Sequence, residues 1–183
     1  MAMWAKGLIS DLDKADESAR RLVEGLSNDQ LNWQPTPGAW SAGQCLEHLC
    51  ITNEQYLPAI ECSLAGKTRS KAEKITPGWF GRWFIESFIE PSGKTKKAKA
   101  PKKIAPASRV NGAVLGRFLS GNQQARKLIE RASEYDVNRI RFKNPFIPLI
   151  RFTVGTGLVI VTRHQHRHLL QAERVKALEG FPK

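Results

Sequence analysis

Three of the four histidines in this chain of 183 residues stand within five positions near its C-terminal end. His164 and His168 are four residues apart, and on a helix this spacing places two side chains on one face. Two imidazole nitrogens placed in this way can bind one transition-metal ion. His166, between them, points to roughly the opposite side. The pair therefore predicts a metal-chelating face on a helix.

A third ligand would complete an open metal site, which typically has three protein ligands and one further position. His48 lies within another predicted helix, and helical bundles build metal sites from facing helices. Metalloproteases carry Glu directly after the first histidine of the pair, where this chain has Gln165, so a protease is excluded. Thr52 and Gln171 share the histidine faces and are predicted to line the pocket. Cys45, one turn before His48, is an alternative group that could approach the metal.

Four amphipathic segments must position these histidines. Apolar residues recur at spacings of three and four, which predicts four long helices, with no convincing series of strands between them. These helices are expected over residues 4–26, 41–65, 108–135 and 152–178. The sequence therefore predicts an all-α protein, a four-helix bundle that forms one domain over residues 1–183.

The second predicted helix carries several local signals. Ser41 and Gln44 have the spacing of a capping box at its N-terminus. Gly66 is suited to its C-terminal end. Pro58 lies inside it and is expected to kink or divide it.

The connection between the second and third helices, residues 66–107, is irregular and long for a compact domain. Trp and Phe residues over 79–89 predict a short aromatic helix. This helix would extend the core, cover the metal pocket as a lid, or form a homodimer interface. A lysine-rich loop, residues 94–103, follows it. A connection of this length would allow the second and third helices to run parallel.

Charge alone does not indicate nucleic-acid binding. The chain has 29 Lys and Arg against 17 Asp and Glu, a net charge of +12. Six lysines within residues 94–103 supply half of that excess, and such a run is typical of a solvated loop. The chain has no helix-turn-helix, zinc-finger or RNA-binding motif, so we do not expect nucleic acid as a partner.

Other features point to a cytoplasmic protein. No apolar run reaches the ~18 residues of a transmembrane helix, and the N-terminus does not resemble a signal peptide. We therefore expect no membrane partner. The cysteines, at positions 45, 50 and 62, have no Cys-x-x-Cys spacing and are expected to be reduced.

Taken in order, the motifs resemble the DinB-like superfamily, bacterial bundles related to the damage-inducible DinB proteins and to bacillithiol- and mycothiol-dependent transferases. The stretches that carry the resemblance are Trp33-Gln34-Pro35-x-x-x-x-Trp40-Ser41-x-x-x-Cys45-Leu46-x-His48-Leu49 and His164-x-x-x-His168-Leu-x-Gln171. The resemblance implies an up-down-down-up bundle. It also implies a divalent metal ion, commonly zinc or nickel, held by His48, His164 and His168.

The function that the resemblance implies is metal-dependent chemistry on a small molecule, either transfer of a low-molecular-weight thiol or hydrolysis of a thiol conjugate. The arginines beside the histidines would then bind acidic groups of the thiol, or else form a solvated face; they are Arg163, Arg167 and Arg174. A non-catalytic metal-binding stress-response scaffold is the alternative, and a nucleic-acid-binding protein that uses the lysine-rich loop is less favoured. A homodimer is implied by resemblance only.

Overall fold

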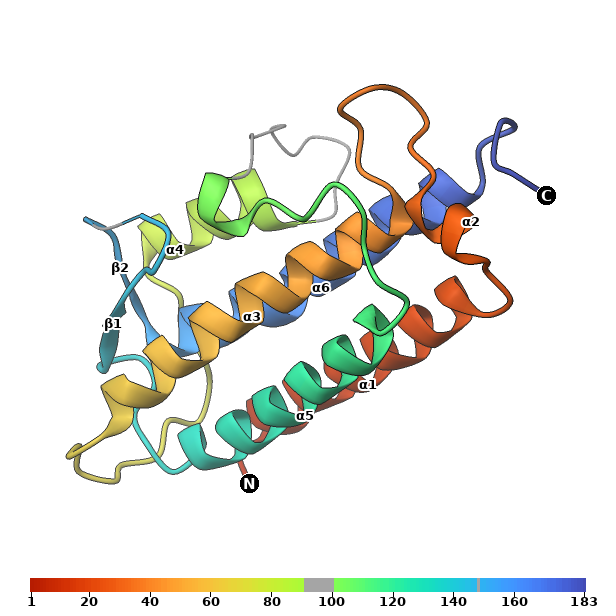
Figure 1. Cartoon of the computed structure of the whole chain (residues 1–183). Helices are drawn as coiled ribbons and strands as arrows, with labels where there is room; N and C mark the ends of the chain where they lie inside the picture. The colour runs from red at the N-terminus through yellow and green to blue at the C-terminus, as the bar shows by residue number, and fades with distance from the viewer. Residues whose placement is uncertain (91–100, 148) are drawn as a thin grey trace.

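Four long helices cross the molecule in the computed structural model, which describes residues 1–90, 101–147 and 149–183. Helices α1 and α6 run in one direction, and α3 and α5 run in the other (Figure 1). The bundle is therefore up-down-down-up, and the predicted all-α fold is confirmed. The helices are α1 (Met3–Val23), α3 (Ala42–Leu64), α5 (Val114–Ala132) and α6 (Val154–Lys176).

Ion pairs between α3 and α5 show that these two helices are parallel. Arg117, near the start of α5, bonds Glu47 at 2.8 Å and Glu54 at 2.6 Å. Arg131, at the end of α5, bonds Glu61 near the end of α3 at 2.8 Å. The long connection before α5 thus returns the chain to the end of the bundle at which α3 began, as its length allowed (Figure 1).

Helix α3 begins and ends where its capping box and its glycine predict. Ser41 and Gln44 form the predicted capping box, with both side chain-to-backbone bonds at 3.1 Å. Gly66, directly after the C-cap, has a φ of +68°, a conformation that glycine adopts without strain. Pro58 does not divide the helix, which continues to Leu64. Pro58 is exposed, and so is Glu54, the residue whose carbonyl the proline deprives of a hydrogen bond.

Several short elements were not predicted. Helix α2 (Asn28–Asn32) begins at a capping box of Ser27 and Gln30. Strands β1 (Arg141–Lys143) and β2 (Arg151–Thr153) form an antiparallel pair. Three-residue strands are too short to show an alternating pattern. The sequence therefore indicated a loop at β1, and it placed Phe152 and Thr153 of β2 in the fourth helix, which begins at Val154 instead. Residues 108–113, expected to be helical, form turns before α5.

The aromatic segment packs against the core on one face. It forms α4 (Trp79–Phe84) and then a π-helical turn (Ile85–Ile89). Ile85 and Ile89 are buried, and the Phe84 ring lies 5.0 Å from that of Phe152 on β2. Trp79 stays 83% exposed. None of the described helices is long and apolar enough to cross a membrane.

Gly157, in the first turn of α6, is required by close packing. A Cβ atom there would lie 2.5 and 2.7 Å from ring atoms of Phe142. We expect Gly157→Ala to lower the free energy of unfolding by about 1–3 kcal/mol, measured by urea denaturation. Gly116→Ala on α5, where a Cβ meets open space, is the control and should not destabilise the protein. Equal stability of the two variants would contradict this packing.

Candidate metal centre

Two neighbouring antiparallel helices, α3 and α6, bring the predicted histidines together. His48 lies near the start of α3, and His164 and His168 lie in the second half of α6. His48 and His168 are buried, and His164 is half-buried. The Nε2 atom of His164 lies 3.3 Å from Nε2 of His48 and 3.0 Å from Nε2 of His168. The three rings can thus present nitrogen atoms to one ion.

Hydrogen bonds at the far side of two rings orient their Nε2 atoms. The Nδ1 atom of His48 donates to the carbonyl oxygen of Ile104 at 2.8 Å, and Nδ1 of His168 donates to Oε1 of Gln171 at 3.0 Å. A carbonyl oxygen only accepts, so each Nδ1 carries the proton of a neutral ring. The Nε2 atoms of both rings therefore present bare lone pairs toward His164, as metal-ligating histidines do.

The electrostatics of the cluster keep the imidazoles neutral. Burial, then the charges of His168, His48 and Arg167, lower the pKa of His164 well below its ordinary value. Burial, then His48 and Arg167, lower the pKa of His168 to about 3, against an opposing effect of its bond to Gln171. Burial also lowers the pKa of His48, although its bond to Ile104 opposes this. Neutral imidazole is the form that binds a metal ion.

Two of the three nitrogen separations fit a tetrahedral ion, and all three candidate ligand atoms lie within 4.8 Å of one another. Zn–N bonds of about 2.1 Å at tetrahedral angles separate two ligand nitrogens by roughly 3.4 Å, close to the separations of 3.0 and 3.3 Å. Lone pairs at this distance repel unless a proton or a cation lies between them. Over the described ranges, His48, His164 and His168 form one group of potential ligands, and no carboxylate or thiolate joins it.

The other predicted site residues have different places. Gln171 accepts a hydrogen bond from His168, so it supports a ring of the cluster. The Thr52 hydroxyl, which is buried, donates to Leu49 of its own helix at 3.0 Å, and its role as pocket lining stays a prediction. His166 is exposed, as expected. The carbonyl of Ile104 was missed, because a backbone group leaves no signal in the residue types.

Trp40 covers part of the cluster. Its ring lies 4.8 Å from that of His48 and 5.7 Å from that of His168, and it is half-buried. Trp40 directly precedes the capping residue Ser41, so the cap that begins α3 also places this ring over the histidines. One side of the cluster is thereby shielded from solvent.

Cys45 takes no part in the group that could share an ion. Cys45 is fully buried among apolar side chains, and this burial raises the pKa of its thiol to about 12. Gln165 is also fully buried, and its amide donates to Asn122 on α5 at 2.7 Å. All three cysteines are free.

The arginines beside the histidines differ in their partners. Arg163 forms an ion pair with the carboxylate of Glu90, at the end of the aromatic segment. Arg167 is half-buried and donates to the backbone carbonyl of Glu90 at 3.3 Å. Burial, then the charge of Arg174, lowers the pKa of Arg167. The lysine-rich loop predicted to fold near them, residues 94–103, lies for the most part outside the described residues.

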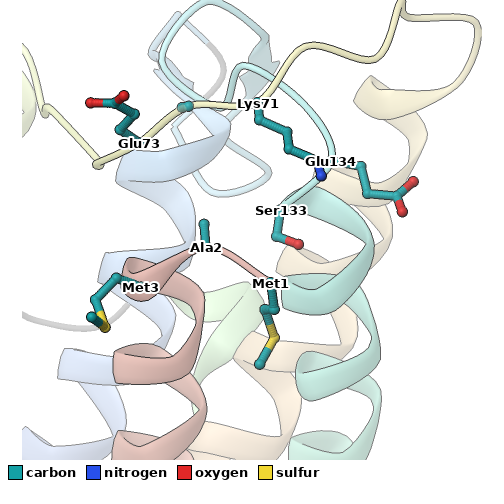
Figure 2. A pocket seen from close by; sticks show the side chains of 8 residues that line it. Met1, Ala2, Met3, Lys71, Glu73, Ser133 and Glu134 are labelled. Atoms are coloured by element: carbon teal, nitrogen blue, oxygen red, sulfur yellow. The ribbon is translucent and has the colours of Figure 1, made fainter.

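A separate cleft of about 440 Å³ opens at the other end of the bundle, where α1 begins and α5 ends (Figure 2). Its lining includes Met1 and Met3 from the start of the chain and Ser133 and Glu134 from the end of α5, and Met1 lies beside Ser133. Its lining contains neither histidine nor cysteine. The cleft therefore has no part in the histidine cluster.

Comparisons with known proteins agree with this fold. No curated protein sequence matches the chain. The structure is similar to that of YfiT from Bacillus subtilis, described as a probable metal-dependent hydrolase with an unusual four-helix bundle topology. The TM-score is 0.62 at 15% sequence identity, over 97% of this chain and 89% of YfiT, a likeness that concerns the fold. The model of the DinB superfamily matches residues 11–172, which include the three clustered histidines, and the chain belongs to that superfamily.

Proposed function

We propose that this protein is a divalent-metal-dependent enzyme in which His48, His164 and His168 are the metal ligands and a small nucleophile is activated. The observation that carries the proposal is that the Nε2 atoms of His48 and His168 both lie within hydrogen-bond distance of the Nε2 atom of His164. Imidazole ligands suit zinc and nickel, the two ions that we expect. YfiT, described as a probable metal-dependent hydrolase, supports metal-dependent chemistry by analogy.

The protein's own groups would hold the rings and shield them. Ile104 and Gln171 keep two rings in the required tautomer, and Trp40 covers the faces of His48 and His168. A divalent ion held by these three histidines would offer an open coordination position and would lower the pKa of a nucleophile that entered it.

The surroundings favour a thiol as the nucleophile. No carboxylate of the described residues joins the cluster, and Gln165 occupies the position of the metalloprotease base. The proton of the nucleophile would then pass to solvent. A thiol, of pKa about 8.5 before it binds, needs a smaller further lowering of its pKa by the ion than water, of pKa about 15.7 before it binds. We therefore propose thiol transfer to an electrophile first and hydrolysis second.

The test is turnover by zinc- and nickel-loaded protein. One assay follows conjugation of 2-mercaptoethanol to chlorodinitrobenzene, and another follows hydrolysis of a nitrophenyl thioester. We expect wild type and His166→Ala to accelerate conjugation at least about tenfold over chelator-treated protein, a modest gain for an enzyme. His168→Ala should fall to that background. Stoichiometric metal binding without either reaction would contradict an enzyme and favour the metal-binding scaffold.

A further inference from the structure

We propose that the β1–β2 hairpin docks this protein on a membrane surface that carries anionic lipids. This role is independent of the histidine cluster, because the hairpin precedes α6 and the two histidines of that helix lie in its second half. No membrane partner was expected because the sequence has no spanning segment, and binding at the surface of a bilayer does not need one.

The two faces of the hairpin differ in character. Phe142 and Phe152 are Cα partners across the two strands, and both side chains are buried in the core. Because side chains alternate along a strand, the neighbouring residues Arg141, Lys143 and Arg151 project from the opposite face. All three are exposed. The outer face of the hairpin is therefore cationic.

These cations lack a negative partner within the protein. Lys143 and Arg151 stand directly opposite each other on the two strands, and like charges in this position destabilise a strand pair. Among the residues that the structure describes, neither forms an ion pair, nor does Arg141, whereas Arg139, just before β1, pairs with Asp136 at 3.4 Å. A negatively charged surface would relieve the repulsion, so the hairpin is complementary to anionic lipid.

The loop that joins the strands is apolar at its tip. Phe146 and Ile150 pack partly against the core, which anchors the base of the loop. A hydrogen bond at 2.9 Å from the amide of Asn144 to the carbonyl of Ile150 closes it. Leu149, in contrast, is 97% exposed, and Ile147 is half-buried. The transfer of such a leucine from water to acyl chains is favourable.

Two tryptophans of α4 add apolar surface beside the hairpin. The Phe80 ring stacks on that of Phe152 in β2 at 5.9 Å, which holds α4 next to the strands (Figure 1). Trp79 is 83% exposed, and Trp83, one turn later, is 45% exposed. Tryptophan is enriched at membrane–water interfaces. Glu86, which follows, is exposed, so one negative charge accompanies the three positive charges of the hairpin.

A lipid surface fits this combination better than two other partners. A second copy of the chain on a two-fold axis would place these cations against their own equivalents, which repel. Nucleic acid would pair with the cations, but Ile147 and Leu149 at the tip have no ring to stack on a base. Anionic phospholipid offers phosphate groups to the cations and acyl chains to the tip and the tryptophans.

The experiment measures co-sedimentation of the full chain with vesicles of phosphatidylcholine alone or of phosphatidylcholine mixed with phosphatidylglycerol. We expect binding to the mixed vesicles only, and weaker binding as salt screens the charges. Leu149→Ser should weaken binding about tenfold, the effect of one leucine side chain. Lys143→Gln combined with Arg151→Gln should weaken it about twentyfold, at roughly fivefold for each charge.

The hairpin variants should not damage the fold. Leu149 is almost fully exposed and has little packing to lose, and the replacement of Lys143 and Arg151 removes a repulsion between the strands. Thermal unfolding followed by circular dichroism should therefore give midpoints no lower than that of wild type. A blue shift of tryptophan emission on vesicle binding, reduced in Trp79→Phe, would place α4 at the same interface.

Matched variants at the opposite end of the bundle control for charge and hydrophobicity. Leu178→Ser removes an exposed leucine after α6, and Arg20→Gln combined with Lys183→Gln removes two exposed cations. These changes lie beyond the reach of a screened charge at the hairpin, so both should keep vesicle affinity within about twofold of wild type.

Several results would overturn the proposal. No binding to mixed vesicles, equal binding to both kinds of vesicle, or equal losses in the hairpin variants and the far-end variants would each do so. Binding to a duplex oligonucleotide but not to vesicles would assign the cations to nucleic acid instead. Self-association in solution that Leu149→Ser abolishes, without vesicle binding, would assign the tip to a second copy of the chain.

Discussion

His48→Ala and His164→Ala should each reduce bound metal from about one ion per chain to less than about a tenth, whereas His166→Ala should leave it unchanged. Loss of one imidazole leaves two ligands, too few to retain zinc or nickel through purification. His166 is the matched control, because it is a histidine on the same helix with an exposed side chain. Elemental mass spectrometry of reconstituted, desalted protein measures the ratio.

The same variants show what the metal does for the fold. Most of the bundle is held by apolar clusters that do not include the histidines, such as the one around Phe118 and Leu46. We therefore expect His164→Ala to keep its helical circular dichroism while it loses metal. Retention of metal by both His48→Ala and His164→Ala would show that the cluster is not the site. Unfolding of both would indicate a structural metal instead.

The second large effect is destabilisation of the metal-free protein by mild acid. Its free energy of unfolding should fall by up to about 4 kcal/mol between pH 7.5 and 5.5. The pKa values of His48, His164 and His168 are all lowered by burial, that of His168 to about 3. At pH 5.5 the unfolded chain binds protons at these histidines, whose ordinary pKa is about 6.5, and the folded chain, in which their pKa values are lower, binds fewer. Each therefore contributes up to about 1.4 kcal/mol.

The sign of this effect is fixed by the direction of the shifts. Stability is full above the unfolded pKa of about 6.5 and is lost as the pH falls toward the folded values. Urea denaturation in a chelating buffer measures it. His168→Gln should reduce the acid loss by about a third. A metal-free wild type that is equally stable at both pH values would contradict the burial of neutral imidazoles.

The sequence alone determines the structural features that depend on the spacing of residues close together in the chain. The four-residue interval between His164 and His168 places both on one face of any helix, and Ser41 with Gln44 begins α3 wherever that helix packs. The apolar periodicity predicts the four long helices for the same reason. The resemblance of the ordered motifs then indicated His48 as the third residue of the cluster.

Only the tertiary structure decided which groups far apart in the chain meet. It places His48 against His164 across 116 positions and brings the carbonyl of Ile104 to His48. It also brings Glu90 to α6, where its carboxylate forms an ion pair with Arg163 and its backbone carbonyl accepts a hydrogen bond from Arg167. Two arginines of the same helix thus have different partners. Every residue carries a carbonyl, and every arginine the same charge, so residue type cannot specify these partners. Packing selects them, because the direction of each helix and the path of the long connection set which surfaces come into contact.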